Sequence, residues 1–252
     1  MVSARLLHTL QSRHLRRKAG LCVAEGLRCV REVLRLLPDT VEQLFCTEEF
    51  LASEEANTLG CPRERLSVLS AQEYETLAET ESPQGILAVL KIPHFPLPEE
   101  PPKPFVLILD RVADPGNLGT ILRTAWAIGM DAVWLVKGSA DPWSPKVMRA
   151  GMGAQCAVRT YFFESLEDAV DAAKSRGIRK IWCTMPGEGI SLFNDAFSLE
   201  DSALVIGNEA NGISHPEVGE PVTIPMPGHA ESLNAAQAAT VFLVEALRKI
   251  SN

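Results

Sequence analysis

Residues 105–123 read FVLILDRVADPGNLGTILR, and this stretch sets the pattern from which the fold can be predicted. Its first five residues are all apolar, which is typical of a short strand buried on both faces of a sheet. The sequence DPG at 114–116 then favours a turn, and Asn117 is suited to cap the helix whose periodicity continues to about 129. The stretch therefore predicts a strand, a loop and a helix, in that order.

The same alternation continues toward the C-terminus. Further apolar runs of the buried-strand type follow at 132–136, 180–184 and 203–206, with a shorter candidate at 222–224. Helical patterns lie between or after them, at 145–153, 165–176 and 232–250. Alternating strands and helices predict a mostly parallel α/β sheet that is covered on both faces. Ligands of such folds bind in the loops beyond the carboxyl ends of the strands.

A proline-rich segment divides the chain. Six of the twelve residues 93–104 are proline, which excludes a helix or an inner strand and predicts an extended, semi-rigid linker. It separates a domain at 1–92 from a domain at 105–252. The first domain reads as a small α/β unit, with helices expected at 5–18, 26–37 and 71–80 and strands at 21–24, 43–46 and 86–90.

The composition is that of a globular protein with a sizeable core. The chain has 252 residues, of which 46% are hydrophobic and 22% charged, and this excludes disordered, collagen-like and disulfide-stapled classes. No apolar run reaches the ~18 residues that a membrane span needs. We therefore expect a cytoplasmic protein without membrane association or a metal site. The cysteines show no CxxC spacing and are expected to be buried, reduced thiols, at positions Cys22, Cys29, Cys46, Cys61, Cys156 and Cys183.

Charge is distributed unevenly along the chain. The net charge of −8 argues against a protein that coats nucleic acid through bulk electrostatics. Residues 1–35, however, carry eight basic and two acidic residues, which indicates either a local anionic partner or a solvated basic helix. The first twenty residues are Arg-rich and free of acid, like a mitochondrial presequence. They are poor in serine and continue into a helical pattern, so we expect them to belong to the mature protein.

The loop after the first strand of the second domain combines Asn117 with Arg123. A helix start with free N–H groups suits an anionic group such as phosphate. An ordinary turn with a salt-bridged arginine would look the same. The spacing matches neither a GxGxxG fingerprint nor a Walker A loop.

Two further loops carry polar residues at strand ends. The loop 207–214, GNEANGIS, places Glu209 between two glycines that permit close backbone approach, and an acid there favours a functional role. The loop 224–234, IPMPGHAESLN, leads into the last helix. Ser232 or Asn234 could function there as a simple N-cap.

Together and in this order, the three loops resemble the motifs of the SpoU/TrmH family of RNA ribose 2′-O-methyltransferases, part of the SPOUT superfamily. The first matches the family's asparagine–arginine motif. The second and third match its GxExxGxS and IPMxGxxxSLN motifs through Gly207, Glu209, Gly212, Ser214, Ile224, Pro225, Met226, Gly228, Ser232, Leu233 and Asn234. The segment 144–154 is similar to the family's SPKxxRASxGA segment, with Gly151 in place of a serine. Residues 16–26 resemble the start of an accessory RNA-binding domain of ribosomal-protein type.

The resemblance implies a trefoil-knotted catalytic domain that pairs as a homodimer and binds S-adenosylmethionine. It implies that the cofactor is held by Thr184, Met185, Pro186, Gly207, Ile224, Met226, Ser232, Leu233 and Asn234. The catalytic set would comprise Arg123, Asn117, Glu209, Ser232 and Asn234. Arg13, Arg16, Arg17 and Lys18 would bind RNA. Where the family has a serine shortly after SLN, this chain has Ala236, so one hydroxyl donor for positioning the substrate is missing.

In this interpretation a ribose 2′-hydroxyl attacks the sulfonium methyl group in line, and no metal is needed. A guanidinium stays charged in proteins, so Arg123 is expected to stabilise the developing alkoxide rather than to accept its proton. Glu209 is expected to order the loops and Arg123. Ribosomal RNA is favoured over transfer RNA, because the accessory domain is of a kind that grips structured RNA by shape and backbone.

Other functions stay open. A transfer RNA 2′-O-methyltransferase would use the same motifs, and a non-catalytic RNA-binding protein could keep the same fold. A nicotinamide dehydrogenase is disfavoured, because its glycine fingerprint is missing.

Overall fold

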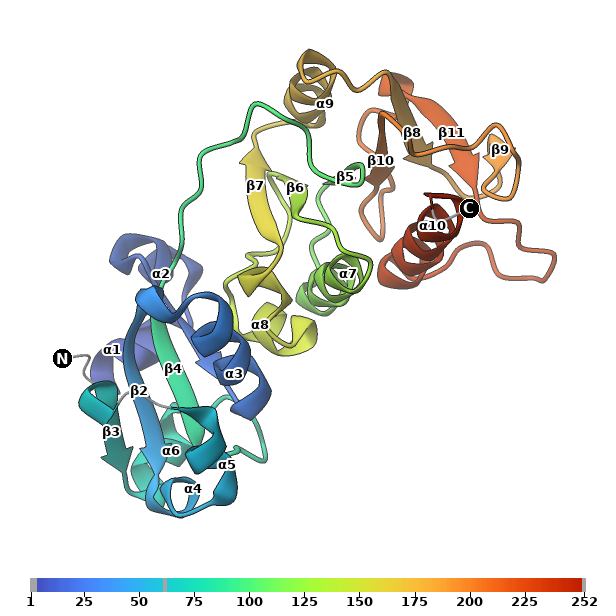
Figure 1. Cartoon of the computed structure of the whole chain (residues 1–252). Helices are drawn as coiled ribbons and strands as arrows, with labels where there is room; N and C mark the ends of the chain where they lie inside the picture. Colours follow the sequence, from blue (N-terminus) through green and yellow to red (C-terminus); the bar gives the residue numbers. More distant parts are fainter. Residues whose placement is uncertain (1–3, 61–62, 251–252) are drawn as a thin grey trace. The chain divides into compact units, whose positions relative to one another are not determined.

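The computed structural model describes residues 4–60 and 63–250, which form two compact units. The first unit contains the chain up to His94 together with Asp141–Ala157. The second contains Phe95–Ala140 and the chain from Val158 onward. Each unit has its own β-sheet and its own core, and Figure 1 labels their elements.

The second unit is built on a seven-stranded sheet in the order β7-β6-β5-β10-β8-β11-β9, in which every pair is parallel. Its strands are β5 (Val106–Leu109), β6 (Ala132–Val136), β7 (Arg159–Phe163), β8 (Lys180–Thr184), β9 (Ile190–Ser191), β10 (Ser202–Ile206) and β11 (Glu220–Thr223). The predicted parallel α/β sheet is confirmed, and so are its five predicted strands. The sequence misses the two edge strands, since β9 has two residues and β7 begins with Arg159 and Thr160.

Helices cover both faces of this sheet, as predicted. They are α7 (Pro115–Ala127), α9 (Leu166–Ser175) and α10 (Ala235–Ile250). Leu166, Val170 and Ala173 of α9 pack into the core cluster on one face. Helices α7 and α10 lie side by side on the opposite face (Figure 1), where the hydroxyls of Thr124 and Thr240 are 3.2 Å apart.

The first unit has a four-stranded sheet in the order β1-β4-β2-β3, in which only the β2–β3 pair is parallel. The strands are β1 (Leu21–Glu25), β2 (Val41–Thr47), β3 (Leu66–Leu69) and β4 (Ile86–Lys91). Its helices are α1 (Ala4–Thr9), α2 (Arg13–Ala19), α3 (Leu27–Leu36), α4 (Glu48–Leu51), α5 (Glu54–Leu59), α6 (Ala71–Leu77) and α8 (Pro145–Gly151). The single helix predicted at 5–18 is two helices, because the chain turns at 10–12.

The segment Asp141–Ala157, which contains α8, packs in the first unit although the sequence places it beyond the linker. Trp143 and Met148 are buried in the same core cluster as Cys22 and Val30. In the sequence, the helix predicted at 145–153 follows the strand predicted at 132–136, as in an ordinary strand–helix alternation of the second domain. Apolar periodicity marks which face of a helix is buried, but it does not mark which core receives that face.

The proline-rich segment contains neither helix nor strand from 92 to 105, as predicted. It is not a free spacer, however, because Phe95 and Leu97 pack against the core of the second unit. The carbonyl oxygen of Pro98 also accepts a hydrogen bond of 2.8 Å from Arg176 Nε. The segment is therefore attached to the second unit from Phe95 onward.

The cysteine prediction is confirmed for four residues, since Cys22, Cys29, Cys46 and Cys183 are buried free thiols. Cys156 is half-buried, and Cys61 lies outside the described residues. Burial raises the pKa of the Cys29 thiol to about 11, so this thiol stays protonated near neutral pH. Within 4–60 and 63–250, no helix is long and apolar enough to cross a membrane.

Candidate active site

The three loops meet at the carboxyl end of the sheet and are joined by a chain of side-chain hydrogen bonds. Asn117 Nδ2, on α7, donates to Glu209 Oε1 at 2.8 Å. Asn234 Nδ2, at the start of α10, donates to Asn117 Oδ1 at 2.9 Å. One chain of three residues therefore links all three sequence motifs, although the residues are 92 and 117 positions apart.

Glu209 also orders the backbone of the first loop. Its two carboxylate oxygens accept long hydrogen bonds of 3.4 Å from the backbone N–H groups of Ala113 and Asp114, just before α7. A carboxylate at this position is favourable, because the N-terminus of a helix carries a partial positive charge. The structure shows no hydrogen bond or ion pair between Glu209 and Arg123 among the described residues, so the expectation that Glu209 orders Arg123 finds no contact to support it.

The helix caps differ from one of the sequence predictions. The N-cap of α7 is Asp114, whose Oδ1 accepts from the backbone N–H of Asn117 at 2.8 Å, so the prediction that Asn117 is the cap is wrong. Asn117 instead uses its side chain in the chain of hydrogen bonds. At α10, Asn234 Oδ1 accepts from the backbone N–H groups of Ala236 and Gln237 at 2.9 and 3.3 Å. Of the two cap candidates left open by the sequence, the structure therefore selects Asn234 over Ser232.

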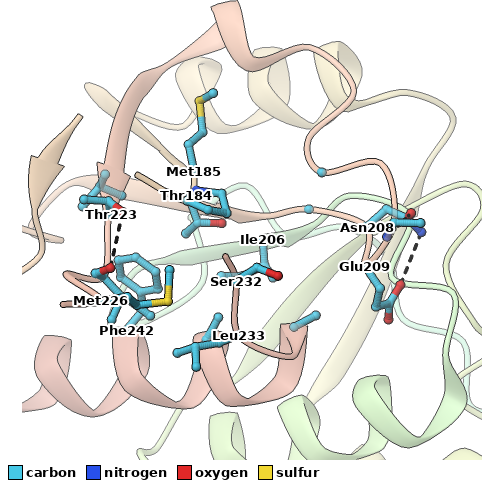
Figure 2. Close-up of a pocket in the computed structure, with 18 residues that line it drawn as sticks. Thr184, Met185, Ile206, Asn208, Glu209, Thr223, Met226, Ser232, Leu233 and Phe242 are labelled. Carbon is cyan, nitrogen blue, oxygen red and sulfur yellow. Dashed lines mark hydrogen bonds between the residues drawn. The ribbon is translucent and has the colours of Figure 1, made fainter. Parts of the chain in front are cut away.

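A pocket of about 360 Å³ opens beside this chain of hydrogen bonds. Figure 2 shows Asn208 and Glu209 at one end, Met226 and Phe242 at the other, and Leu233 between them. The volume lies in the range of sites that bind small molecules. Its lining comes from Thr184, Met185, Pro186, Ile206, Gly207, Asn208, Glu209, Ala210, Gly212, Val222, Thr223, Ile224, Met226, Ser232, Leu233, Ala235, Ala238 and Phe242.

Eight of the nine residues expected to bind the cofactor line this pocket, and Asn234 does not. The sequence misses Asn208, Ala235, Ala238 and Phe242. Three of these recur at helical spacing on α10 and so share one face, a pattern that could have indicated them. Asn208 lies beside Glu209 and could have been found by the same strand-end argument.

Arg123 lies apart from the pocket. Its side chain is exposed on α7, and within the described residues it makes no ion pair or hydrogen bond. Six residues of α-helix separate it from Asn117 by about 9 Å along the axis and by more than one and a half turns. The two side chains therefore leave α7 on different faces.

The basic residues of the first unit have different environments. Arg13, Arg17 and Lys18 are exposed on α2. Arg16 is 2% exposed, and its guanidinium donates to Asp141 Oδ2 and to the carbonyl oxygens of Leu10 and Gln11. The expectation that Arg16 binds RNA is therefore wrong, because its donors are used inside the unit.

The two positions at which the family pattern has serine are both buried. Ala236 is 4% exposed and lies in the first turn of α10, and Gly151 is a buried residue at the end of α8. Among the described residues, no group of three or more His, Cys, Asp or Glu side chains is arranged to hold a metal ion.

Comparison with known proteins gives the context for this geometry. Residues 104–244 match the model of the SpoU rRNA methylase family, and residues 4–88 match that of the MRM3-like substrate binding domain. A 23S rRNA guanosine 2′-O-methyltransferase of Bacillus subtilis is 32% identical, over 94% of this chain and 91% of its own. A putative RNA methyltransferase of the TrmH family from Porphyromonas gingivalis has a TM-score of 0.83 and 32% identity, with 99% of both chains covered.

A second solved structure includes a bound ligand. The SpoU methyltransferase AviRb from Streptomyces viridochromogenes, in complex with the cofactor AdoMet, has a TM-score of 0.81 and 26% identity, with 99% of both chains covered. The family model spans more than half of the chain and covers all three motif loops. This chain belongs to the SpoU rRNA methylase family.

Proposed function

We propose that this protein transfers a methyl group from S-adenosylmethionine to a ribose 2′-hydroxyl of ribosomal RNA. The observation that carries the proposal is the chain Glu209–Asn117–Asn234, which joins the three motif loops beside a pocket of small-molecule size. Relatives from Bacillus subtilis and Streptomyces viridochromogenes, 32% and 33% identical, are 2′-O-methyltransferases of 23S rRNA. We extend that substrate class, the RNA of the large ribosomal subunit, to this chain.

The pocket fits the cofactor by the chemistry of its walls. Ile206, Leu233 and Phe242 provide apolar surface for a flat ring, and the strand-end loops bring backbone N–H and C=O groups that suit its polar edge. Eight of the residues that the family resemblance assigns to the cofactor lie in this lining. When bound, S-adenosylmethionine supplies a methyl group on a sulfonium, which is an excellent leaving group.

The protein's own residues then have to align the ribose and stabilise charge. We assign to Asn117 and Asn234 the positioning of the substrate beside the pocket, because hydrogen bonds fix both amides. Arg123 provides a permanent positive charge for the developing alkoxide. If Arg123→Lys recovers its full rate at high pH, a titrating base replaces this assignment.

Two features support a homodimer: Arg123 is exposed outside the pocket of its own copy, and α10 has exposed apolar side chains. Helix α10 lies beside α7 and exposes an apolar stripe of Val244, Leu247 and Ile250, which are 53%, 41% and 49% exposed. A second copy would cover this stripe, and most soluble oligomers are symmetric dimers. In such a dimer, Arg123 of one copy would serve the pocket of the other.

Mixing two inactive variants tests this arrangement. Arg123→Ala removes the guanidinium, and Gly207→Val obstructs the pocket of the other variant. If the arginine acts across the dimer, random exchange in a closed two-fold dimer restores about a quarter of wild-type activity. If activity stays absent although mixed dimers form, Arg123 acts on its own pocket or not at all.

We further propose that the catalytic unit is knotted and that the protein works where ribosomes are assembled, in the cytoplasm. The likeness to solved structures of the TrmH and SpoU families over 99% of both chains supports the knot that the family resemblance implies. The exposed Arg13, Arg17 and Lys18 would contact RNA, in keeping with the match of the first unit to a substrate-binding domain.

The decisive experiment offers the protein S-adenosylmethionine with unmodified ribosomal or transfer RNA, and assays the digested nucleosides for 2′-O-methylation. We expect methylation in the ribosomal pool alone. Methylation of transfer RNA alone would refute the substrate class but keep the reaction. If neither RNA is methylated and calorimetry detects no cofactor binding, a non-catalytic RNA-binding protein is favoured.

A further inference from the structure

Arg111 has a backbone conformation that few residues with a side chain adopt. It is the second residue after β5 and has φ of 58°, in the left-handed region. This region is unfavourable for a residue with a Cβ atom. Such strain persists where the surroundings determine the conformation, and it is concentrated at functional sites. Arg111 is also six residues before Asn117, in the same loop.

Three different elements hold Arg111 in place. Its carbonyl oxygen accepts a hydrogen bond of 2.8 Å from Asn208 Nδ2, whose residue lines the pocket. Its aliphatic stem lies over Gly138, where a Cβ atom would be 3.0 Å from Arg111 Cγ. Its Nε is 3.3 Å from Oδ1 of Asp110, a fully buried carboxylate whose other oxygen accepts from the backbone N–H of Ser214.

The guanidinium is oriented but only partly used. The side chain is 39% exposed, and among the described residues its two terminal nitrogens make no hydrogen bond. A guanidinium presents its donors in a planar fork that matches the oxygens of a phosphate. A fork that the protein has already oriented loses less conformational entropy when it binds such a group.

The location separates this guanidinium from the cofactor pocket. Arg111 does not line the pocket, which lies on the side of β8, β11 and α10. Its stem contacts Gly138, which follows β6, on the other side of β5 in the sheet. An anion bound there would therefore be next to the loop that carries Asn117, and outside the pocket.

We propose that Arg111 binds a backbone phosphate of the substrate RNA beside the nucleotide that is methylated. The inference rests on the proposed function, since it needs an RNA substrate at this end of the sheet. The net charge of −8 makes a diffuse electrostatic attraction for RNA weak, so a few oriented cations have to supply the local contacts. Arg111 is one of them, and Asp110 is its positioning residue.

The test measures how the affinity for RNA depends on salt. An unmodified 23S rRNA transcript is bound to wild type, Arg111→Met and Arg111→Lys over about 50 to 200 mM salt, with S-adenosylhomocysteine present so that no turnover occurs. We expect Arg111→Met to raise Kd on the order of tenfold and to reduce the salt slope by about 0.7 to 0.9. Arg111→Lys keeps the charge and should keep the slope while binding more weakly. Arg179→Met is the matched control, because Arg179 is 85% exposed and its nearest carboxylate, Asp201, is 4.0 Å away.

Two further measurements separate a failure of this inference from a failure of the proposed function. They are the cofactor affinity of each variant by calorimetry and the methylation of the transcript by the wild-type protein. An unchanged slope in Arg111→Met, with wild type binding and methylating the transcript, would overturn this inference alone. Loss of cofactor binding in Arg111→Met would assign the residue a purely structural role and would also overturn it. If wild type neither binds nor methylates any RNA, the proposed function and this inference fall together.

Discussion

Replacing Arg16 by Met should destabilise the first unit, whereas replacing its neighbour Arg17 should leave the stability of that unit nearly unchanged. Arg16 is 3% exposed in its side chain, and its partner Asp141 is 13% exposed. The guanidinium donates to Asp141 Oδ2 from two nitrogens, at 3.1 and 2.7 Å, and to two carbonyl oxygens at 2.7 Å each. Removing one partner of a buried ion pair costs about 3 to 5 kcal/mol, because the other charge stays buried and unpaired.

Hydrogen exchange followed by mass spectrometry measures this effect within one unit. At about 1.4 kcal/mol per tenfold change, exchange of peptides from β1 and α8 in Arg16→Met should accelerate by roughly two to three and a half powers of ten. Arg17→Met removes an exposed side chain, so its effect on stability should stay within about 0.5 kcal/mol. Arg17→Met should instead weaken the affinity for RNA. Equal exchange in the two variants would refute the assignment of Arg16 to the core.

Two further changes test the second unit. Gly207→Ala should weaken cofactor binding, because the new Cβ atom would lie 2.5 Å from the carbonyl carbon of Gly212 and force the two segments apart. Calorimetry should show at least a tenfold loss of affinity for S-adenosylmethionine. An unchanged affinity would contradict the tight approach of the two segments. His215 Nδ1 donates a hydrogen bond of 3.0 Å to Glu217 Oε1, and His215 Nε2 is 3.1 Å from Glu167 Oε1. These contacts raise the pKa of His215 above the ordinary 6.5, and the bond to Glu217 contributes most. Since the folded-state pKa is raised, the stabilisation is complete below about pH 6.5 and is lost as pH rises through the folded value. His215→Gln should therefore flatten the pH dependence of the thermal midpoint, and an unchanged profile would contradict the contribution of this cluster.

Much of the second unit could be predicted from local patterns. A buried parallel strand is an uninterrupted apolar run, so β5, β6, β8 and β10 are visible in the sequence. Strand ends then indicate the loops to inspect, and in one of them Glu209 is an acid that a turn does not require. The eight pocket residues expected to bind the cofactor come from the resemblance of these loops to the family motifs, and the strand ends alone do not identify them.

Long-range partners could not be predicted in the same way. Arg16 stands in a run of three basic residues, and its sequence gives no sign that it alone is buried. Its environment depends on Asp141, 125 positions away, and on the packing of Trp143 in the first unit. Local periodicity carries no information about a partner at that distance.

The role of Asn234 shows why the cap and the functional interpretation do not exclude each other. Glu209, as a carboxylate, can only accept, so Asn117 has to give its Nδ2 to it and keeps Oδ1 as an acceptor. Asn234 then has to donate Nδ2 to that oxygen, which leaves its own Oδ1 to cap α10. An aspartate would cap the helix but could not donate, and a serine has a single short hydroxyl. The donor-to-acceptor direction of these hydrogen bonds therefore requires an amide at position 234. This requirement can be derived only when Glu209 is known to be the final acceptor.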